Sequence, residues 1–142
     1  MTKTVFEKII DREIPAHIVY EDEYVLAFLD LSQVTKGHTL VIPKHHEATI
    51  FDYSDELASQ VFSRIPKIAR GLRQAFPDMK GLNILNNNGE VAFQTVFHSH
   101  IHLIPRYTEG DDFGLKWADN SENYSQEDLA SIAQQIHNSI KD

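Results

Sequence analysis

His98, His100 and His102 occupy every second position of one short, otherwise largely apolar stretch. Successive side chains of a β-strand point to opposite faces, so this alternation predicts three imidazoles on one face of a strand. The intervening and following apolar residues are expected in the core: Phe97, Ile101 and Leu103. An imidazole row can bind a metal, present a nucleophilic nitrogen, or form a half-buried polar face without chemistry. The strict alternation, next to Gln94 and Thr95, favours a chemical role over a polar face without chemistry.

Hydrophobic periodicity, together with the residues that begin or end helices and strands, predicts the elements that would position this row. Helices are predicted after a capping box at Thr4 and Glu7, from Ser54 to Phe76 with a kink at Pro66, and after Ser125. Strands are predicted at 17–20 and 24–29 as a hairpin, at 39–42, at 81–85, and in the histidine stretch. Interspersed helices and strands with short connections indicate a single α+β domain over residues 1–142, with a mainly antiparallel sheet.

The composition of the chain argues against several classes of function. The formal net charge of −8 argues against a nucleic-acid partner, which needs a basic surface. A small anionic ligand stays possible, because backbone amides and a few donors can hold it locally. No run of eighteen apolar residues and no apolar N-terminal segment occur, so neither a membrane span nor a signal peptide is expected and a cytoplasmic location is the default. The absence of cysteine excludes disulfides and thiolate ligands.

The segment from Gln94 to Ile104 resembles the signature of the histidine triad family, His-x-His-x-His followed by apolar positions. Three further segments resemble the Hint and bacterial Hit-like branch of that family, and together they cover most of the chain: 5–15, 25–43 and 81–106. The resemblance implies a five-stranded, mainly antiparallel sheet with packed helices, assembled as a homodimer. It implies a hydrolase acting at the α-phosphate of purine nucleoside phosphoramidates or related adenylates. We expect no cofactor and no resident metal in this chain.

In this resemblance His100 is the nucleophile, and it forms a nucleotidyl-histidine intermediate that water hydrolyses. A neutral imidazole is an effective nucleophile, and the flanking rings of His98 and His102 disfavour a charged one. Charge developing on the phosphoryl oxygens needs preorganised donors, for which Thr95, Gln94 and His102 are suitable. Thr95 stands where many members of the family carry serine; its alternative role is a plain strand threonine.

The resemblance also implies a nucleotide site. Asp30 matches the residue that binds the ribose hydroxyls, Asn87 an asparagine near the α-phosphate, and His38 a fourth histidine close by. Each has a plainer alternative, since Asp30 and Asn87 also fit turns and His38 stands alone beside a glycine. The positions that match the purine-contacting residues are Phe28, Leu31, Val5, Phe6 and Ile9; each could equally be core.

The chain departs from the family pattern at two places: the loop that contains Phe93, and the positions that bind zinc in some relatives. Phe93 stands where relatives often have glycine, which puts in doubt any backbone contact to phosphate there. Some relatives bind zinc through Cys-x-x-Cys and two later histidines; the matching residues here are Thr4, Glu7, His46 and His98. Loss of both thiolates removes the strongest zinc ligands, so we expect the capping box to form that corner instead, with at most an adventitious ion.

Three alternatives stay open at this point. A dinucleoside polyphosphate hydrolase would use the same residues on a different substrate. A nucleotide-binding or partner-binding dimer would have only incidental catalysis. A metal protein would use the histidine row as ligands.

Overall fold

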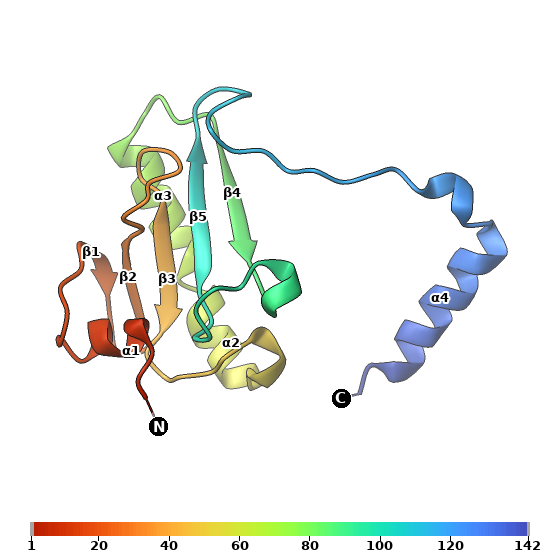
Figure 1. Cartoon of the computed structure of the whole chain (residues 1–142), viewed down its shortest axis with the longest axis horizontal. Helices are drawn as coiled ribbons and strands as arrows, with labels where there is room; N and C mark the ends of the chain where they lie inside the picture. The colour runs from red at the N-terminus through yellow and green to blue at the C-terminus, as the bar shows by residue number, and fades with distance from the viewer. Residues whose placement is uncertain (1, 142) are drawn as a thin grey trace.

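The computed structural model describes residues 2–141. Its centre is one antiparallel sheet of five strands in the order β1-β2-β3-β5-β4 (Figure 1). The strands are β1 (Ile18–Glu21), β2 (Val25–Leu29), β3 (Thr39–Pro43), β4 (Gly81–Asn86) and β5 (Ile101–Arg106). β3 is the middle strand: Phe28 pairs with Leu40 of β3, which pairs in turn with His102 of β5. The predicted α+β class is confirmed.

Two helices cover one face of the sheet. α2 (Asp55–Phe62) begins at the N-cap Ser54, and α3 (Ile65–Ala75) follows after a break at residues 63 and 64. Pro66 lies in the first turn of α3, where proline costs no intrahelical hydrogen bond, so the predicted kink is a break between two helices. The core between these helices and the sheet is apolar: Val25, Ala27, Val41, Leu57, Val61, Ile65, Ile68, Leu72, Ile101 and Leu103.

The opposite face is covered by the short helix α1 (Val5–Ile10). The predicted capping box is present: the Thr4 hydroxyl accepts from the Glu7 amide, and the Glu7 carboxylate accepts from the Thr4 amide. Its inward residues join the alternate side chains of β2 and β3 in a second core: Phe6, Ile9, Leu26, Phe28, Leu40 and Ile42. A helix of six residues cannot cover the whole face, so part of it stays open.

The histidine stretch differs from the prediction in two respects. β5 begins only at Ile101, so His102 alone of the three lies in a strand, and His98 and His100 lie in the segment that leads into it. Phe97 is 47% exposed rather than part of the core, because the chain turns before the strand begins. Ile101 and Leu103 are buried on the α2–α3 face as expected.

The connections contain three short 3-10 turns: η1 (Ile50–Asp52), η2 (Glu90–Ala92) and η3 (Ser121–Asn123). After β5 the chain leaves the body as an extended segment and ends in α4 (Gln126–Ser139), which stands apart from the sheet (Figure 1). We call residues 109–142 the C-terminal arm. No helix within residues 2–141 is both long and apolar enough to cross a bilayer.

Candidate active site

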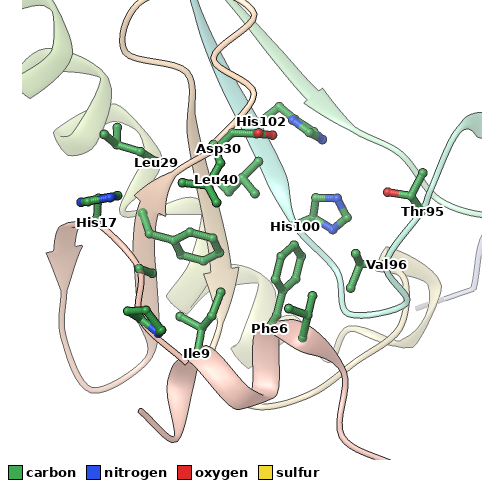
Figure 2. A pocket seen from close by; sticks show the side chains of 15 residues that line it. Phe6, Ile9, His17, Leu29, Asp30, Leu40, Thr95, Val96, His100 and His102 are labelled. Atoms are coloured by element: carbon green, nitrogen blue, oxygen red, sulfur yellow. The ribbon is translucent and has the colours of Figure 1, made fainter. Parts of the chain in front are cut away.

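A cavity of about 450 Å³ opens on the α1 face, where the short helix leaves β2, β3 and β5 uncovered (Figure 2). One part of its lining is apolar and comes from α1, β2 and β3: Val5, Phe6, Ile9, Phe28, Leu29 and Leu40. Polar groups lie at the other end, where Asp30, Thr95, His100 and His102 meet. The cavity therefore offers an apolar wall at one end and convergent polar side chains at the other, which is typical of a small-molecule site.

His100 is held in one tautomer by its own backbone surroundings. Its Nδ1 lies 2.8 Å from the carbonyl oxygen of His98, which can only accept, so Nδ1 carries the hydrogen. Nε2 consequently keeps its lone pair. Phe6 packs edge-on against the ring with centroids 4.9 Å apart, and burial lowers the pKa of His100 below its ordinary value. The ring is therefore neutral at pH 7, with a free lone pair at the cavity.

His102 and His38 form a hydrogen-bonded pair of imidazoles. The backbone N–H of Val34 donates to His38 Nδ1, so His38 carries its hydrogen on Nε2. That Nε2 lies 2.9 Å from His102 Nδ1, which accepts, and the neutral His102 must then carry its hydrogen on Nε2. Burial, then the neighbouring His100 and His38, lower the pKa of His102 to about 4. His102 is thus a neutral hydrogen-bond donor, and its ring lies 5.1 Å from that of His100.

Asp30 is the carboxylate of the polar end. Its Oδ1 accepts hydrogen bonds from both the backbone N–H and the hydroxyl of Ser32, and its Oδ2 lies 3.6 Å from His38 Nε2. Burial alone would raise the pKa of Asp30, but the Ser32 hydrogen bonds and the nearby imidazoles hold it below its ordinary value. The ionised carboxylate keeps acceptor capacity toward the cavity, which suits a pair of hydroxyl donors.

His98 does not line the cavity. Its ring is fully buried, and its Nε2–H donates to the carbonyl oxygen of Pro43 at 2.8 Å. What reaches the site from His98 is its backbone carbonyl, which fixes the tautomer of His100. The prediction that all three imidazoles share the pocket is therefore wrong: two do, and the first lies behind them.

Gln94, predicted to donate to a phosphoryl oxygen, is fully engaged by the protein. Its Nε2 donates to the carbonyl oxygens of Ala48 and Val96, and its Oε1 accepts from the Gly89 amide. The side chain is 2% exposed, so it clamps the loop that carries Thr95 rather than facing a ligand. Thr95 itself lines the cavity, and its hydroxyl has no hydrogen-bond partner among residues 2–141.

The asparagine loop also differs from the expectation. Asn87 does not line the cavity and makes no side-chain hydrogen bond within the described chain. Its neighbours do the positioning: Asn86 Nδ2 donates to the His100 carbonyl at 3.0 Å, and Asn88 Oδ1 accepts from the Ile50 amide. Sequence reasoning missed Asn86, because its pairing with Ile101 depends on the register of β4 against β5, for which the sequence has no signal. The lining residues that it missed are Pro15, Ala16, His17, Leu29, Leu40 and Val96.

Phe93 adopts the conformation that glycine favours. Its backbone has φ 69° and ψ 23°, in the left-handed region, directly after η2. Its side chain is 82% exposed, so no packing compensates for the backbone conformation. The loop thus keeps a left-handed turn with phenylalanine in place.

The corner implied for zinc in some relatives does not fit that ion here. The Thr4 hydroxyl and Glu7 carboxylate are engaged in the capping box, His46 Nε2–H donates to the Phe97 carbonyl, and His98 Nε2–H donates to Pro43. Unbonded candidate ligand atoms remain on His98, His46 and Glu7, but they do not converge within 4.8 Å of one another, and they are fewer than the four ligands of a tetrahedral site. Asp30, His38 and His102 also approach one another, with candidate ligand atoms within 4.8 Å, but the two facing nitrogens already share a hydrogen.

Comparisons with known proteins show which family shares this sequence and fold. The HIT domain family matches residues 11–109. The chain belongs to the HIT family. It is 57% identical over 132 residues to the Bacillus subtilis protein named Protein hit, covering 93% of this chain and 90% of that one. A crystal structure of a HIT family member from Bacillus subtilis superposes with a TM-score of 0.95, at 53% identity, over 99% of both chains.

A relative with a named activity is more distant. The adenosine 5'-monophosphoramidase of Schizosaccharomyces pombe is 34% identical over 137 residues, which cover 96% of this chain and 98% of that protein. HIT membership, and with it the five-stranded antiparallel fold, is thus established for this chain.

Proposed function

We propose that this HIT protein is a nucleotide hydrolase that cleaves purine nucleoside phosphoramidates or related adenylates at the α-phosphate. One observation carries the proposal: His100 faces the cavity with a neutral ring whose Nε2 lone pair is fixed by the Nδ1–H bond to the His98 carbonyl. A neutral, oriented imidazole next to a pocket with an apolar wall is the arrangement that covalent phosphoryl-group chemistry requires.

In the proposed reaction, His100 Nε2 attacks the α-phosphorus as the P–N bond breaks, and the leaving nitrogen takes a proton from solvent and departs as a neutral amine. His102, neutral with its hydrogen on Nε2, donates to a phosphoryl oxygen as charge builds up, and the free Thr95 hydroxyl serves the same oxygens or the leaving group. Water then attacks the phosphorus of the nucleotidyl-histidine, the bond to His100 breaks, and the nucleoside monophosphate departs. The apolar wall of Phe6, Ile9 and Phe28 holds the base, and Asp30 accepts from the ribose hydroxyls.

Support at the level of the family comes from the named phosphoramidase of Schizosaccharomyces pombe, which aligns over nearly the whole chain. A homodimer and a cytoplasmic location stay predictions from the family resemblance and the composition.

The test is AMP release from adenosine phosphoramidate, followed by chromatography, with an acid quench to trap protein-bound AMP. We expect turnover, a trapped adduct on His100, and a loss of about 10⁴-fold or more in His100→Ala, because the reaction loses its nucleophile. His45→Ala serves as a control, since that imidazole is exposed and lies outside the cavity lining. No AMP release, or an unchanged rate in His100→Ala, would refute the proposal; faster turnover of diadenosine polyphosphates would move it to the other substrate class.

A further inference from the structure

The segment that carries the proposed nucleophile is held in place without strand pairing. The pairing of β5 with β3 and with β4 begins at Ile101, so residues 97–100 make no ladder hydrogen bonds within the described chain. The tautomer of His100 nevertheless depends on this segment, because the His98 carbonyl accepts from its Nδ1. Contacts other than those of the sheet must therefore fix the backbone here.

The peptide between His98 and Ser99 is the part of this segment that contacts the His100 ring. Its carbonyl group, from His98, accepts from His100 Nδ1 at 2.8 Å, and its N–H group, from Ser99, donates to the Glu47 carbonyl at 2.8 Å. The C=O and N–H groups of a trans peptide lie in one plane and point in opposite directions. The Glu47 carbonyl therefore orients this peptide from the side opposite to the ring.

The side chain of Ser99 provides a second anchor. Its Oγ lies 2.8 Å from the hydroxyl oxygen of Tyr53, and Ser99 is 1% exposed. Neither hydroxyl makes another hydrogen bond within residues 2–141. Tyr53 directly follows η1 and packs against the buried cluster under α2 and α3, so it meets Ser99 on the side of the sheet away from the cavity. Burial raises the pKa of Tyr53 above its ordinary value, so the phenol is protonated at neutral pH.

We propose that Tyr53 is a positioning residue for the proposed reaction: through Ser99 it fixes the peptide whose carbonyl keeps the hydrogen of His100 on Nδ1. Neither Tyr53 nor Ser99 lines the cavity. Tyr53 therefore acts on the attacking imidazole and leaves the contacts of base and ribose unchanged. The kinetic consequence rests on the proposed hydrolase, whereas the tautomer of His100 can be measured without a substrate.

The two anchors of Ser99 depend on each other. A hydrogen bond weakens steeply as its angle departs from linearity, so the bond to Glu47 orients the peptide only while Ser99 keeps its place. The Tyr53 hydroxyl holds that place through the side chain. When this bond is lost, Ser99 can shift, and the His98 carbonyl shifts with it because the peptide between them is planar. The Nδ1–H of His100 then loses its acceptor, and the hydrogen can move to Nε2, the nitrogen that must attack.

Three variants of the full chain separate positioning from simple support of the fold. Tyr53→Phe and Ser99→Ala each leave one buried hydroxyl without its partner, which lowers the free energy of unfolding. The double variant removes both hydroxyls and should unfold nearly as the parent does. Tyr24→Phe is the matched control, because Tyr24 packs against the same cluster and its hydroxyl makes no hydrogen bond within residues 2–141. Urea unfolding measures all four stabilities.

Activity and tautomer are then measured on the same proteins. We expect kcat for adenosine phosphoramidate to fall about tenfold or more in both single variants and in the double variant, because a misplaced nucleophile is poorly aligned with phosphorus. KM should stay unchanged, since the lining of the cavity is unaltered. Nitrogen-15 NMR of the imidazoles, with His100 assigned by its loss in His100→Gln, should show Nδ1 protonated in the parent and in Tyr24→Phe. The other three variants should show a mixture of tautomers.

Two results would overturn the proposal. An unchanged tautomer in Tyr53→Phe would do so whatever the kinetics. A double variant that regains kcat together with stability would mean that Tyr53 only supports the fold. Failure of the proposed hydrolase looks different: a parent that releases no AMP, with variants that still change the tautomer, refutes the activity and leaves the positioning of His100 in place.

Discussion

The two faces of the sheet are built from the same strands but do different work. β2, β3 and β5 place alternate residues on each face, so Val41 and Leu103 pack under α2 and α3 while Leu40 and His102 face α1. The α2–α3 face is covered by two helices of eight and eleven residues, which pack on the larger of the two buried apolar clusters. The α1 face has a helix of six residues and a cavity.

The difference shows where stability and chemistry are located. Burial of apolar area stabilises the domain mainly on the α2–α3 face, which has the larger buried apolar cluster. That face also has a groove of about 400 Å³ between α3 and β1, but its lining contains no imidazole or carboxylate. The open face leaves imidazoles and a carboxylate partly buried, at a cost in stability, and the pKa values of Asp30, His100 and His102 are all lower than their ordinary values. Four predictions, in order of decreasing effect, test this division.

The largest effect is expected for truncation on the α2–α3 face. Leu57→Ala on α2 should lower the free energy of unfolding by roughly 2–5 kcal/mol, because it leaves a cavity in a packed core. Ile9→Ala on α1 should cost about half as much, since Ile9 already borders an open cavity, but it should raise the KM for a purine nucleotide. Urea unfolding and steady-state kinetics measure the two. Equal stability losses with unchanged KM would mean that the faces are equivalent.

Gln94 tests whether hydrogen bonds replace packing on the open face. Gln94→Leu leaves the Gly89 amide and the Ala48 carbonyl without their partner, which should cost roughly 1–3 kcal/mol. Since the clamp holds the loop that carries Thr95, kcat should fall as well. Gln74→Leu, at an exposed glutamine on α3 whose side chain makes no hydrogen bond within residues 2–141, is the matched control and should change neither quantity.

Acid should destabilise the protein through the open face. Burial lowers the pKa of His98, His100 and His102, the last from 6.5 to about 4. The unfolded chain therefore binds more protons than the folded one below pH 6.5, and stability present above that pH is lost as the pH falls toward 4. Urea unfolding at pH 7 and pH 5 measures the loss, and His102→Gln should reduce the difference between the two. A pH-independent unfolding free energy would contradict it.

The smallest effect is expected for Phe93. Phe93→Gly relieves a left-handed backbone at an exposed position and should raise the free energy of unfolding by roughly 0.5–1 kcal/mol. The same change at Phe97, which is also exposed but outside that backbone region, should not stabilise. Thermal unfolding of both variants gives the comparison. An equal or opposite effect at Phe93 would mean that the loop carries no strain.

Much of the architecture follows from local signals in the sequence. The apolar runs of β2 and β3, the capping box at Thr4, the helix start at Ser125 and the prolines predicted the elements, because short-range sterics and periodicity govern them. The site was predicted in part: Asp30, Thr95, His100 and His102 do converge on the cavity. His98 and Gln94 do not, because a residue type that can donate to a ligand can equally donate to a nearby carbonyl.

The sequence alone determined that this protein has an alternating imidazole row, an α+β pattern and an acidic C-terminal segment. Tertiary structure decided which imidazole faces the cavity. The Pro43 carbonyl, distant in the chain, holds the His98 ring behind the site, and the Val34 amide fixes the tautomer of His38. Tertiary structure also decided that Asn86 rather than Asn87 holds the His100 carbonyl, through the register of β4 against β5. Hydrogen-bond competition and strand register are non-local, so periodicity cannot resolve them.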